Sequence, residues 1–320
     1  MGTTKRRTIP PTDAFRDEWL ALQLPYPAPD ANKYSRGKLV AFAGSVQYPG
    51  AALLAADAAL ISGAGYVQVV SESSVVSLVH AHRASLVATD LADWSEERFS
   101  APRAGHPCAY LVGSGYDPSD AATAQHVLNV LARAKAPVLV DGGGLAALDA
   151  PEALELLAMR AQQGYPTVLT PHAGEAARLE AAFAKNAPGN GHAGGTGIRE
   201  TTCEEALARK LAAHYHAIIV LKGPVTFVCD GENLYRMDKG TAALAKAGTG
   251  DVLAGMTAAF LAQGLEPFTA SALGARLHAE AGHEAAARKT AICVTAEDVV
   301  DMIPESIKKV RSYIERTISC

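Results

Sequence analysis

One tetrapeptide combines glycines with an acid in a way that suits phosphate chemistry. Gly248-Thr249-Gly250-Asp251 is followed at once by an apolar helical pattern. The glycines allow the backbone to come close to a ligand, and the start of a helix offers free N–H groups at the positive end of its dipole. A phosphate can bind there, with the Asp251 carboxylate beside it. The pattern leaves open that Asp251 only caps the helix, which contributes about 1 kcal/mol.

A second motif, Lys222-Gly223-Pro224-Val225-Thr226, follows the apolar run 218–221. In open α/β sheets, ligands bind beyond the carboxyl ends of the strands. At such a place Lys222 can contact a phosphate and Thr226 can offer a hydroxyl group. The alternative is a lysine at the end of a strand, followed by an ordinary turn.

A third motif, Thr170-Pro171-His172-Ala173-Gly174-Glu175, also follows an apolar run. His172 and Glu175 are three residues apart, so they can share one face of the next helix. The alternative is that the helix starts at Thr170 or His172 and that Glu175 completes a capping box. We prefer the capping role for Glu175 and a ligand-binding role for His172.

Three further turns carry glycine after a β-rich run. Gly44-Ser45 and Gly113-Ser114-Gly115 let the backbone approach a ligand, and Asp141 precedes three glycines. Asp141 can bind a metal through water or cap a helix. Four histidines on helical patterns are interpreted as packing or surface residues: His80, His82, His278 and His283.

The elements that position these motifs alternate along the chain. Apolar runs that do not alternate with polar residues are typical of strands buried on both faces, and here they occur at 39–43, 66–70, 110–112, 138–140, 168–170 and 218–221. Ala-rich helical patterns follow them, which predicts βαβ crossovers. A hairpin is predicted at 226–229 and 234–237, around Asp230-Gly231, and long helices at 251–263 and 267–288. The sequence therefore predicts an α/β fold, in which helices flank both faces of a mainly parallel central sheet.

Composition narrows the class of protein. Hydrophobic residues make up 49% of the 320 residues and charged residues 19%, which excludes a disordered chain. The net charge of −4 argues against nucleic-acid binding by bulk charge, and no apolar stretch is long enough to span a membrane. The five cysteines form no C-x-x-C pair, and there is no signal peptide, so we expect reduced thiols in the cytoplasm.

The domain organisation is read from the same patterns. Residues 1–30 are rich in proline and predict an N-terminal extension with a short helix within 13–22. Residues 31–320 predict a single catalytic domain, interrupted by an exposed, Gly-rich loop at 183–199. A domain of this size fills the chain, so no second, fused domain is expected.

Taken in order, these motifs resemble the ADP-dependent NAD(P)H-hydrate dehydratase family. The resemblance extends from Lys33 to Ala287, and the joint order of the motifs is far more specific than any one of them. It includes the turns at Gly44 and Gly113, Asp141, Thr170–Glu175, Leu221–Thr226 and Gly248–Gly255. The resemblance implies a ribokinase-like fold.

The resemblance also implies an activity and a set of site residues. A hydrated NADH or NADPH is dehydrated back to NADH or NADPH. ADP or ATP, accompanied by Mg²⁺, phosphorylates the ring hydroxyl, and phosphate then leaves. Asp251 is the implied catalytic base and also contacts the substrate, together with Ala51, Gly115 and His172. The adenine nucleotide is assigned to Lys222, Gly223, Pro224, Val225, Thr226 and Gly250. A homo-oligomer, namely a tetramer, is implied as well.

The chain departs from the family pattern at several positions. Asn32 stands where a histidine is usual, and Gly143 stands where a second acid is usual. Ala243 lies in a loop that usually reads Gly-Asn-Pro-Gly, and Ala247 replaces a further glycine. These positions bear on the geometry of the substrate loops and on nucleotide preference, while the segment around Asp251 is intact.

Two other functions stay open. One is a kinase of the same fold that acts on a vitamin precursor such as hydroxyethylthiazole or hydroxymethylpyrimidine. The other is a nucleotide-sensing protein without catalytic activity. A kinase releases a phosphorylated product, the dehydratase releases inorganic phosphate, and a sensor turns over no substrate.

Overall fold

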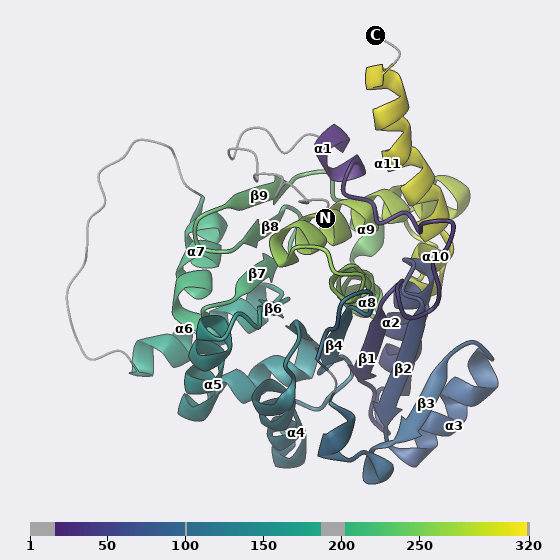
Figure 1. The fold of residues 1–320 in the computed structure, drawn as a ribbon. Helices are drawn as coiled ribbons and strands as arrows, with labels where there is room; N and C mark the ends of the chain where they lie inside the picture. Colours follow the sequence, from purple (N-terminus) through teal and green to yellow (C-terminus); the bar gives the residue numbers. More distant parts are fainter. Residues whose placement is uncertain (1–16, 100, 187–201, 319–320) are drawn as a thin grey trace.

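One nine-stranded sheet organises the part of the chain that the computed structural model describes, residues 17–99, 101–186 and 202–318 (Figure 1). Its strands are β1 (Lys38–Phe42), β2 (Tyr66–Ser71), β3 (Val87–Asp90), β4 (Cys108–Val112), β5 (Val138–Val140), β6 (Thr167–Leu169), β7 (Ile218–Leu221), β8 (Thr226–Cys229) and β9 (Leu234–Met237). Their order is β3-β2-β1-β4-β5-β6-β7-β8-β9. All neighbours up to β7 are parallel, while β8 and β9 pair antiparallel as the predicted hairpin. The predicted mainly parallel sheet is confirmed.

Helices cover both faces of the sheet, as predicted. They are α1 (Asp17–Ala21), α2 (Pro49–Ile61), α3 (Ser73–His82), α4 (Ala121–Arg133), α5 (Pro151–Gln162), α6 (Ala173–Asn186), α7 (Cys203–Tyr215), α8 (Thr249–Ala262), α9 (Pro267–Lys289), α10 (Ala296–Asp301) and α11 (Ile303–Ile318). Alternate residues of β1 belong to different cores, because side chains of a strand point to opposite faces. Leu39 and Ala41 pack with α2, α8 and α9, whereas Val40 and Phe42 pack with residues of α4, α5 and α7.

Some elements were not predicted. β3 reads Val-Ala-Thr-Asp and is half-buried throughout, so it lacks the apolar run that marks the inner strands. The 3₁₀ helix Gly142–Asp149 was missed because three glycines open it, and α10 was missed because it has only six residues. Short or polar elements of this kind depend on tertiary packing more than on local pattern.

Helices α2 and α8 pack unusually close to one another. Both are rich in buried alanine, and a Cβ atom added at Gly255 would lie 2.1 Å from the carbonyl oxygen of Ala55. Larger side chains would force the two backbones apart. The start of α8 is therefore held firmly against α2, and through α2 against the end of β1.

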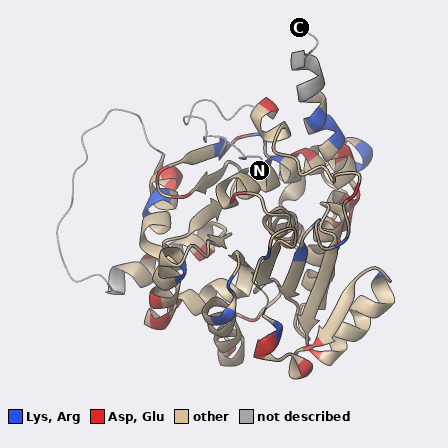
Figure 2. Cartoon of the chain, in the orientation of Figure 1, with Lys and Arg blue, Asp and Glu red and all other residues tan. Residues whose placement is uncertain are grey.

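The strand order reverses at β1, which determines where a ligand can bind. β1 pairs with β2 on one side and with β4 on the other, so the loops that follow β1 and β4 leave the sheet edge in opposite directions. In open α/β sheets, such a reversal opens a crevice beyond the carboxyl ends of the strands. Figure 2 shows basic and acidic residues interspersed on the surrounding helices, while most of the sheet is uncharged.

The described part of the N-terminal segment packs on the rest of the chain. Leu20 and Ala21 of α1 are buried, and α1 contacts α9 and α11. Residues 1–16, and residues 187–199 of the predicted exposed loop, lie outside the described residues. Among the helices that the structure describes, none has the length and apolar character needed to cross a membrane.

Candidate active site

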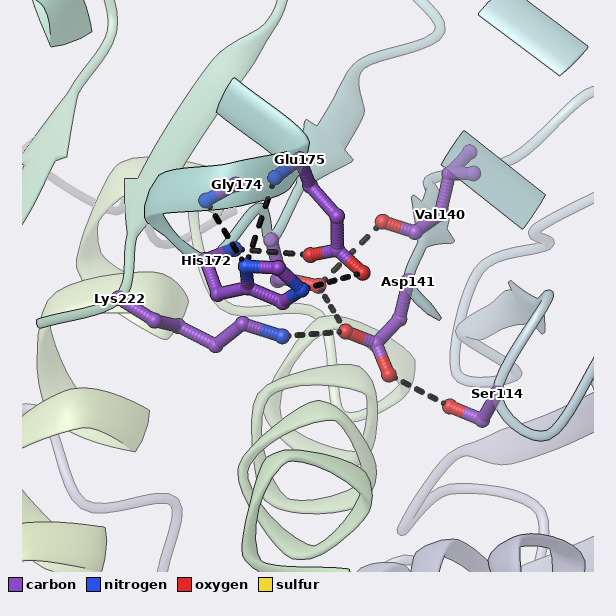
Figure 3. Close-up of polar contacts among 8 residues, drawn as sticks. Ser114, Val140, Asp141, His172, Gly174, Glu175 and Lys222 are labelled. Carbon is purple, nitrogen blue, oxygen red and sulfur yellow. Dashed lines mark hydrogen bonds and ion pairs between the residues drawn. The ribbon is translucent and has the colours of Figure 1, made fainter. Parts of the chain in front are cut away.

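Asp141 is the centre of a buried polar cluster at the carboxyl edge of the sheet (Figure 3). Its Oδ1 accepts hydrogen bonds from Lys222 Nζ (3.0 Å) and Thr170 Oγ1 (2.6 Å), and its Oδ2 accepts one from Ser114 Oγ (2.8 Å). Asp141 is only 2% exposed, and a charge buried to this degree needs such partners. The four residues follow β4, β5, β6 and β7, so the cluster joins the ends of four adjacent strands.

The cluster corrects the sequence interpretation of Asp141. Asp141 precedes the helix Gly142–Asp149, but its side chain makes no capping hydrogen bond there. Its two oxygens are engaged by a lysine and two hydroxyl groups instead. Of the two roles that the sequence left open, metal binding and helix capping, the structure thus contradicts capping. Asp141 forms an ion pair with Lys222.

Asp251 does not cap a helix. α8 begins at Thr249, two residues earlier than predicted, and Gly248 is its N-cap with a φ of 90°. Asp251 lies at the third position of the first turn and is partly buried. Glycine is needed at 248 because a positive φ strains other residues. Asp251 is thus not the N-cap, and its carboxylate instead forms hydrogen bonds with Ser114 and with its own backbone N–H group.

The surroundings of Asp251 hold its proton near neutral pH. Burial raises its pKa from the ordinary 3.8 to about 7, and the nearby charge of Asp141 acts in the same direction. The charge of Lys222 and hydrogen bonding with Ser114 act in the opposite direction. Since the Ser114 hydroxyl has one proton and also donates to Asp141, the two carboxylates share this donor. A carboxylate with a pKa near 7 is suited to proton transfer at neutral pH.

Lys222 lies between the two acids and the start of α8. Its side chain is 19% exposed. Burial lowers the pKa of Lys222, but the carboxylates of Asp141, Glu175 and Asp251 raise it by more, so the ammonium group stays charged. A Cβ atom added at Gly250 would lie 3.5 Å from Lys222 Nζ, which shows how closely the lysine approaches the first turn of α8. The structure therefore brings Lys222, Gly250 and Asp251 together.

The rest of the predicted nucleotide segment forms the turn between β7 and β8. Gly223 and Pro224 are exposed there, and Val225 is half-buried. Thr226 begins β8 and is buried, and its hydroxyl donates to the Gly223 carbonyl oxygen at 3.4 Å. The Thr226 hydroxyl thus closes the turn, and the exposed backbone at 223–224 is the part that can face a ligand.

His172 and Glu175 open α6 and bond to one another's backbone. His172 N donates to Glu175 Oε2 (2.8 Å), and His172 Nδ1 accepts from Gly174 N (3.0 Å). Glu175 thus plays the capping role that the sequence favoured. Because Nδ1 accepts a hydrogen bond, we assign the ring proton to Nε2, on a side chain that is 60% exposed. Nε2 lies 3.4 Å from Glu175 Oε1, so a ligand that accepts from this nitrogen competes with Glu175.

Two of the four predicted substrate residues line a cavity of about 380 Å³. Gly115, with a φ of 74°, and His172 line this cavity together with Tyr48, Tyr116 and Gly143. Ala51 lies behind Gly115, since a Cβ atom added at Gly115 would be 2.6 Å from Ala51 Cβ. The loops after β1 and β4 therefore touch at this point, and Ala51 shapes the wall without lining it.

Gly143, where the family pattern has an acid, lies against the chain at Tyr116. A Cβ atom added at Gly143 would lie 2.0 Å from the Tyr116 carbonyl oxygen, so no side chain fits without moving this turn.

Asn32, where the family pattern has a histidine, lies in a different part of the chain. Asn32 Oδ1 accepts from Tyr34 N and Ser35 N, which stabilises a turn before β1.

Three residues near the centre were missed as site residues. Ser114 and Thr170 each belong to a motif that follows a strand, and that position is the signal that identifies them. His278, interpreted as a packing residue, is indeed buried in α9, but it also forms a hydrogen bond with the backbone of Thr249. Burial lowers the pKa of His278 to about 4, so its ring is neutral and supports the first turn of α8 without adding charge.

Comparison with known proteins gives one consistent result. Residues 39–305 match the family model described as NAD(P)H-hydrate dehydratase. Among curated relatives, the bifunctional NAD(P)H-hydrate repair enzyme Nnr of Moorella thermoacetica is 32% identical over 94% of this chain and 55% of its own length. The ADP-dependent (S)-NAD(P)H-hydrate dehydratase of Xanthomonas campestris is 29% identical over 88% of this chain and 91% of its own length. This chain spans about half the length of the bifunctional relatives that it matches.

A solved structure agrees with the sequence comparison. The ADP/ATP-dependent NAD(P)H-hydrate dehydratase of Bacillus subtilis, co-crystallised with ATP and Mg²⁺, superposes with a TM-score of 0.73 at 25% identity. The match covers 92% of this chain and 97% of the other. The predicted ribokinase-like fold is therefore confirmed.

Proposed function

Because this chain belongs to the NAD(P)H-hydrate dehydratase family, we propose that it uses an adenine nucleotide to dehydrate hydrated NADH or NADPH. One observation carries the proposal: Asp251, with a pKa of about 7, lies in the first turn of α8 near Lys222. A base, a fixed cation and free helix N–H groups are what transfer of a phosphoryl group to a hydroxyl requires.

The first step transfers a phosphoryl group. Asp251 accepts the proton of the ring hydroxyl while the hydroxyl oxygen forms a bond to the terminal phosphorus of the nucleotide. The bond from that phosphorus to its bridging oxygen breaks, and the nucleotide leaves with one phosphate fewer. Lys222 and the backbone N–H groups at Gly250 stabilise the negative charge on the phosphoryl oxygens.

The second step expels phosphate. The lone pair of the ring nitrogen forms a double bond to the carbon that carries the phosphate ester, and the C–O bond breaks. Inorganic phosphate takes the bonding electrons, and loss of a proton from the neighbouring carbon restores the reduced nicotinamide. Gly115 and His172 are proposed to hold the ring in the cavity that they line.

A magnesium ion fits this site as a companion of the nucleotide. Mg²⁺ in such sites is bound by one or two carboxylates, water and substrate phosphates rather than by a protein cage. Asp141 Oδ2 accepts a single hydrogen bond, from Ser114, and is the oxygen of this carboxylate that would hold such an ion. When bound, the ion supplies positive charge to the phosphates.

The test is a turnover assay on the purified chain. Hydrated NADH is mixed with ADP or with ATP, and the absorbance of the reduced nicotinamide and the release of inorganic phosphate are followed together. We expect both signals to rise in equal amounts. A stable phosphorylated product without phosphate release would indicate a kinase. No turnover with either hydrate and either nucleotide would leave only a nucleotide-binding role.

We further infer that the chain works in the cytoplasm as a homo-oligomer, a tetramer as the family resemblance implies. Four cysteines, Cys108, Cys203, Cys229 and Cys293, are free thiols in the structure, which agrees with a reducing compartment. Light scattering on the purified protein measures its mass in solution. A monomeric mass at assay concentration would contradict the tetramer.

A further inference from the structure

A second cavity, of about 410 Å³, opens next to the one that Gly115 and His172 line, and Tyr116 belongs to both. It lies beyond the ends of β1, β2 and β4, where the strand order reverses, and Gly44, Ser71 and Glu72 form part of its wall. A dinucleotide has two nucleoside halves. One half must reach Asp251 to react, and the other must bind nearby. Two adjoining cavities of this size meet that requirement.

Glu72 is the acid in the second cavity that is free to bind. It follows β2 directly, is exposed, and makes no capping hydrogen bond although it precedes α3. The other two acids in the wall are engaged: Asp117 accepts from Ser119, and Asp120 caps α4 through the Ala122 N–H group. No lysine or arginine lines this cavity within the described residues.

Tyr116 supplies an unused donor beside Glu72. Its side chain is only 8% exposed, yet its hydroxyl has no hydrogen-bond partner in the described part of the chain. Burial raises the pKa of this phenol, and the charge of Glu72 raises it further, so the two groups are close and the hydroxyl stays protonated. The hydroxyl is not among the fully buried polar atoms without a partner, so it keeps contact with solvent, and a ligand in the cavity that Tyr116 lines can accept a hydrogen bond from it.

The placement of Glu72 determines which ribose fits. In sheets that bind dinucleotides, an acid accepts hydrogen bonds from the free ribose hydroxyls, whereas an arginine accommodates a 2′-phosphate. A 2′-phosphate in this cavity would face three carboxylates, and such juxtaposition of like charges is strongly unfavourable. His126 also lines the cavity, but burial lowers the pKa of its ring and so disfavours its cationic form.

We propose that this second cavity binds the adenosine ribose of the dinucleotide, with Glu72 accepting from its 2′- and 3′-hydroxyls and Tyr116 donating to the ligand. The chain then acts on hydrated NADH in preference to hydrated NADPH. This inference rests on the proposed function, because it assigns the reacting half of the same substrate to the adjoining cavity that Gly115 and His172 line.

The experiment measures binding of NADH and NADPH to the full chain by calorimetric titration. In the unmodified protein, NADH should bind roughly tenfold or more tightly than NADPH. Glu72→Arg should narrow or reverse this ratio. Glu155→Arg makes the same charge change at an exposed position of α5 and should leave the ratio unchanged. Tyr116→Phe should weaken both ligands by about two- to tenfold and also keep the ratio.

The outcomes separate this inference from the proposed function. Equal affinity for NADH and NADPH in the unmodified protein, or a ratio that Glu72→Arg does not move, overturns the inference. Melting curves for each variant check folding, which the exposed position of Glu72 should preserve. A protein that shows the predicted ratio but turns over neither hydrate contradicts the proposed function and keeps the binding preference.

Discussion

Asp141, at the end of β5, and Asp251, in the first turn of α8, are two acids of one centre whose surroundings differ. Asp141 is 2% exposed and accepts hydrogen bonds from Lys222, Thr170 and Ser114. Asp251 shares two of these neighbours, Ser114 and Lys222. Burial and the charge of Asp141 raise the pKa of Asp251 to about 7.

The number of donors around each carboxylate explains this difference. Hydrogen bonds and a paired cation favour the charged form of an acid, whereas burial and a nearby like charge favour the neutral form. Both acids are at least partly buried and both lie near Lys222 and Ser114, but for Asp251 the effects of burial and of the Asp141 charge are the larger ones. The centre therefore holds Asp141 in a network of three donors and prepares Asp251 to exchange a proton.

The largest effect is expected from Asp251→Asn. Asparagine cannot accept a proton as a carboxylate does, so turnover at saturating ADP should fall by ~10²–10⁴-fold. Stability at pH 8 should be unchanged or slightly higher, because the variant removes a partly buried charge beside Asp141. Turnover and a thermal melt measure the two effects.

The control for Asp251→Asn is Glu205→Gln, which also removes an acid from the third position of a helix, α7, on the other face of the sheet. It should leave turnover intact. Near-normal turnover of Asp251→Asn would remove the base assignment, and a large drop in its melting temperature would indicate a structural role instead.

Lys222→Ala should have the next largest effect, because it removes a charged partner from buried Asp141. The free energy of unfolding should fall by up to about 3 kcal/mol, since Asp141 keeps two hydroxyl donors. Binding of ADP should weaken more than binding of the dinucleotide. Lys210→Ala removes an exposed ion pair with Glu180 and should cost about 0–1 kcal/mol. Equal losses for both ligands would contradict the nucleotide assignment of Lys222.

The pH dependence should report the raised pKa of Asp251. Its carboxylate must be ionised to accept a proton, so kcat/KM should rise with pH, with a midpoint near 7. Asp141→Asn removes a negative charge that raises this pKa, so the midpoint should move to lower pH. A midpoint that Asp141→Asn leaves in place would show that the two acids are not coupled.

The same titration has a consequence for stability. The pKa of Asp251 is higher in the folded than in the unfolded chain, so the folded state binds the proton more tightly. The contribution of Asp251 to the free energy of unfolding should therefore be greatest below about pH 4. It should decline as the pH rises to about 7. Asp251→Asn should abolish this part of the decline in melts over that range.

The smallest effect is expected from His172→Ala, outside the buried cluster. The ring is 60% exposed and its Nε2 also lies 3.4 Å from Glu175 Oε1, so it contributes at most one hydrogen bond to the ligand, and the KM for the hydrated dinucleotide should rise about two- to tenfold, with less effect on ADP. His80→Ala changes another exposed histidine, in α3, and should leave the KM values for the hydrated dinucleotide and for ADP unchanged. A larger effect on ADP than on the dinucleotide would reassign His172.

The sequence predicted the strands and loops that surround this site better than the role of Asp141 within it. Apolar runs located the inner strands, and the motifs after them located Lys222, His172 and Asp251. The role of Asp141 was not predicted, because a strand-end acid before glycines has the same pattern whether it caps a helix, binds a metal or pairs with a lysine 81 residues away. Such a pairing is a property of the strand order, which no local pattern specifies.

The start of α8 shows the same limit on a smaller scale. Two glycines and a threonine have low helix propensity, so the sequence placed the helix start at Asp251 instead of Thr249. Burial of Thr249, whose hydroxyl donates to the Leu244 carbonyl oxygen at 2.7 Å, stabilises the extra residues. That tertiary contact moved Asp251 from a capping position into the first turn.

The contact between Gly143 and Tyr116 restricts the substitutions that this position can accept. Aspartate at 143 would place a Cβ atom 2.0 Å from a backbone oxygen, so it fits only if the 113–116 turn changes its course. That turn also contains Ser114, which bonds to Asp141. An acid at 143 therefore requires a second, compensating substitution that moves the turn and keeps the hydrogen bond between Ser114 and Asp141.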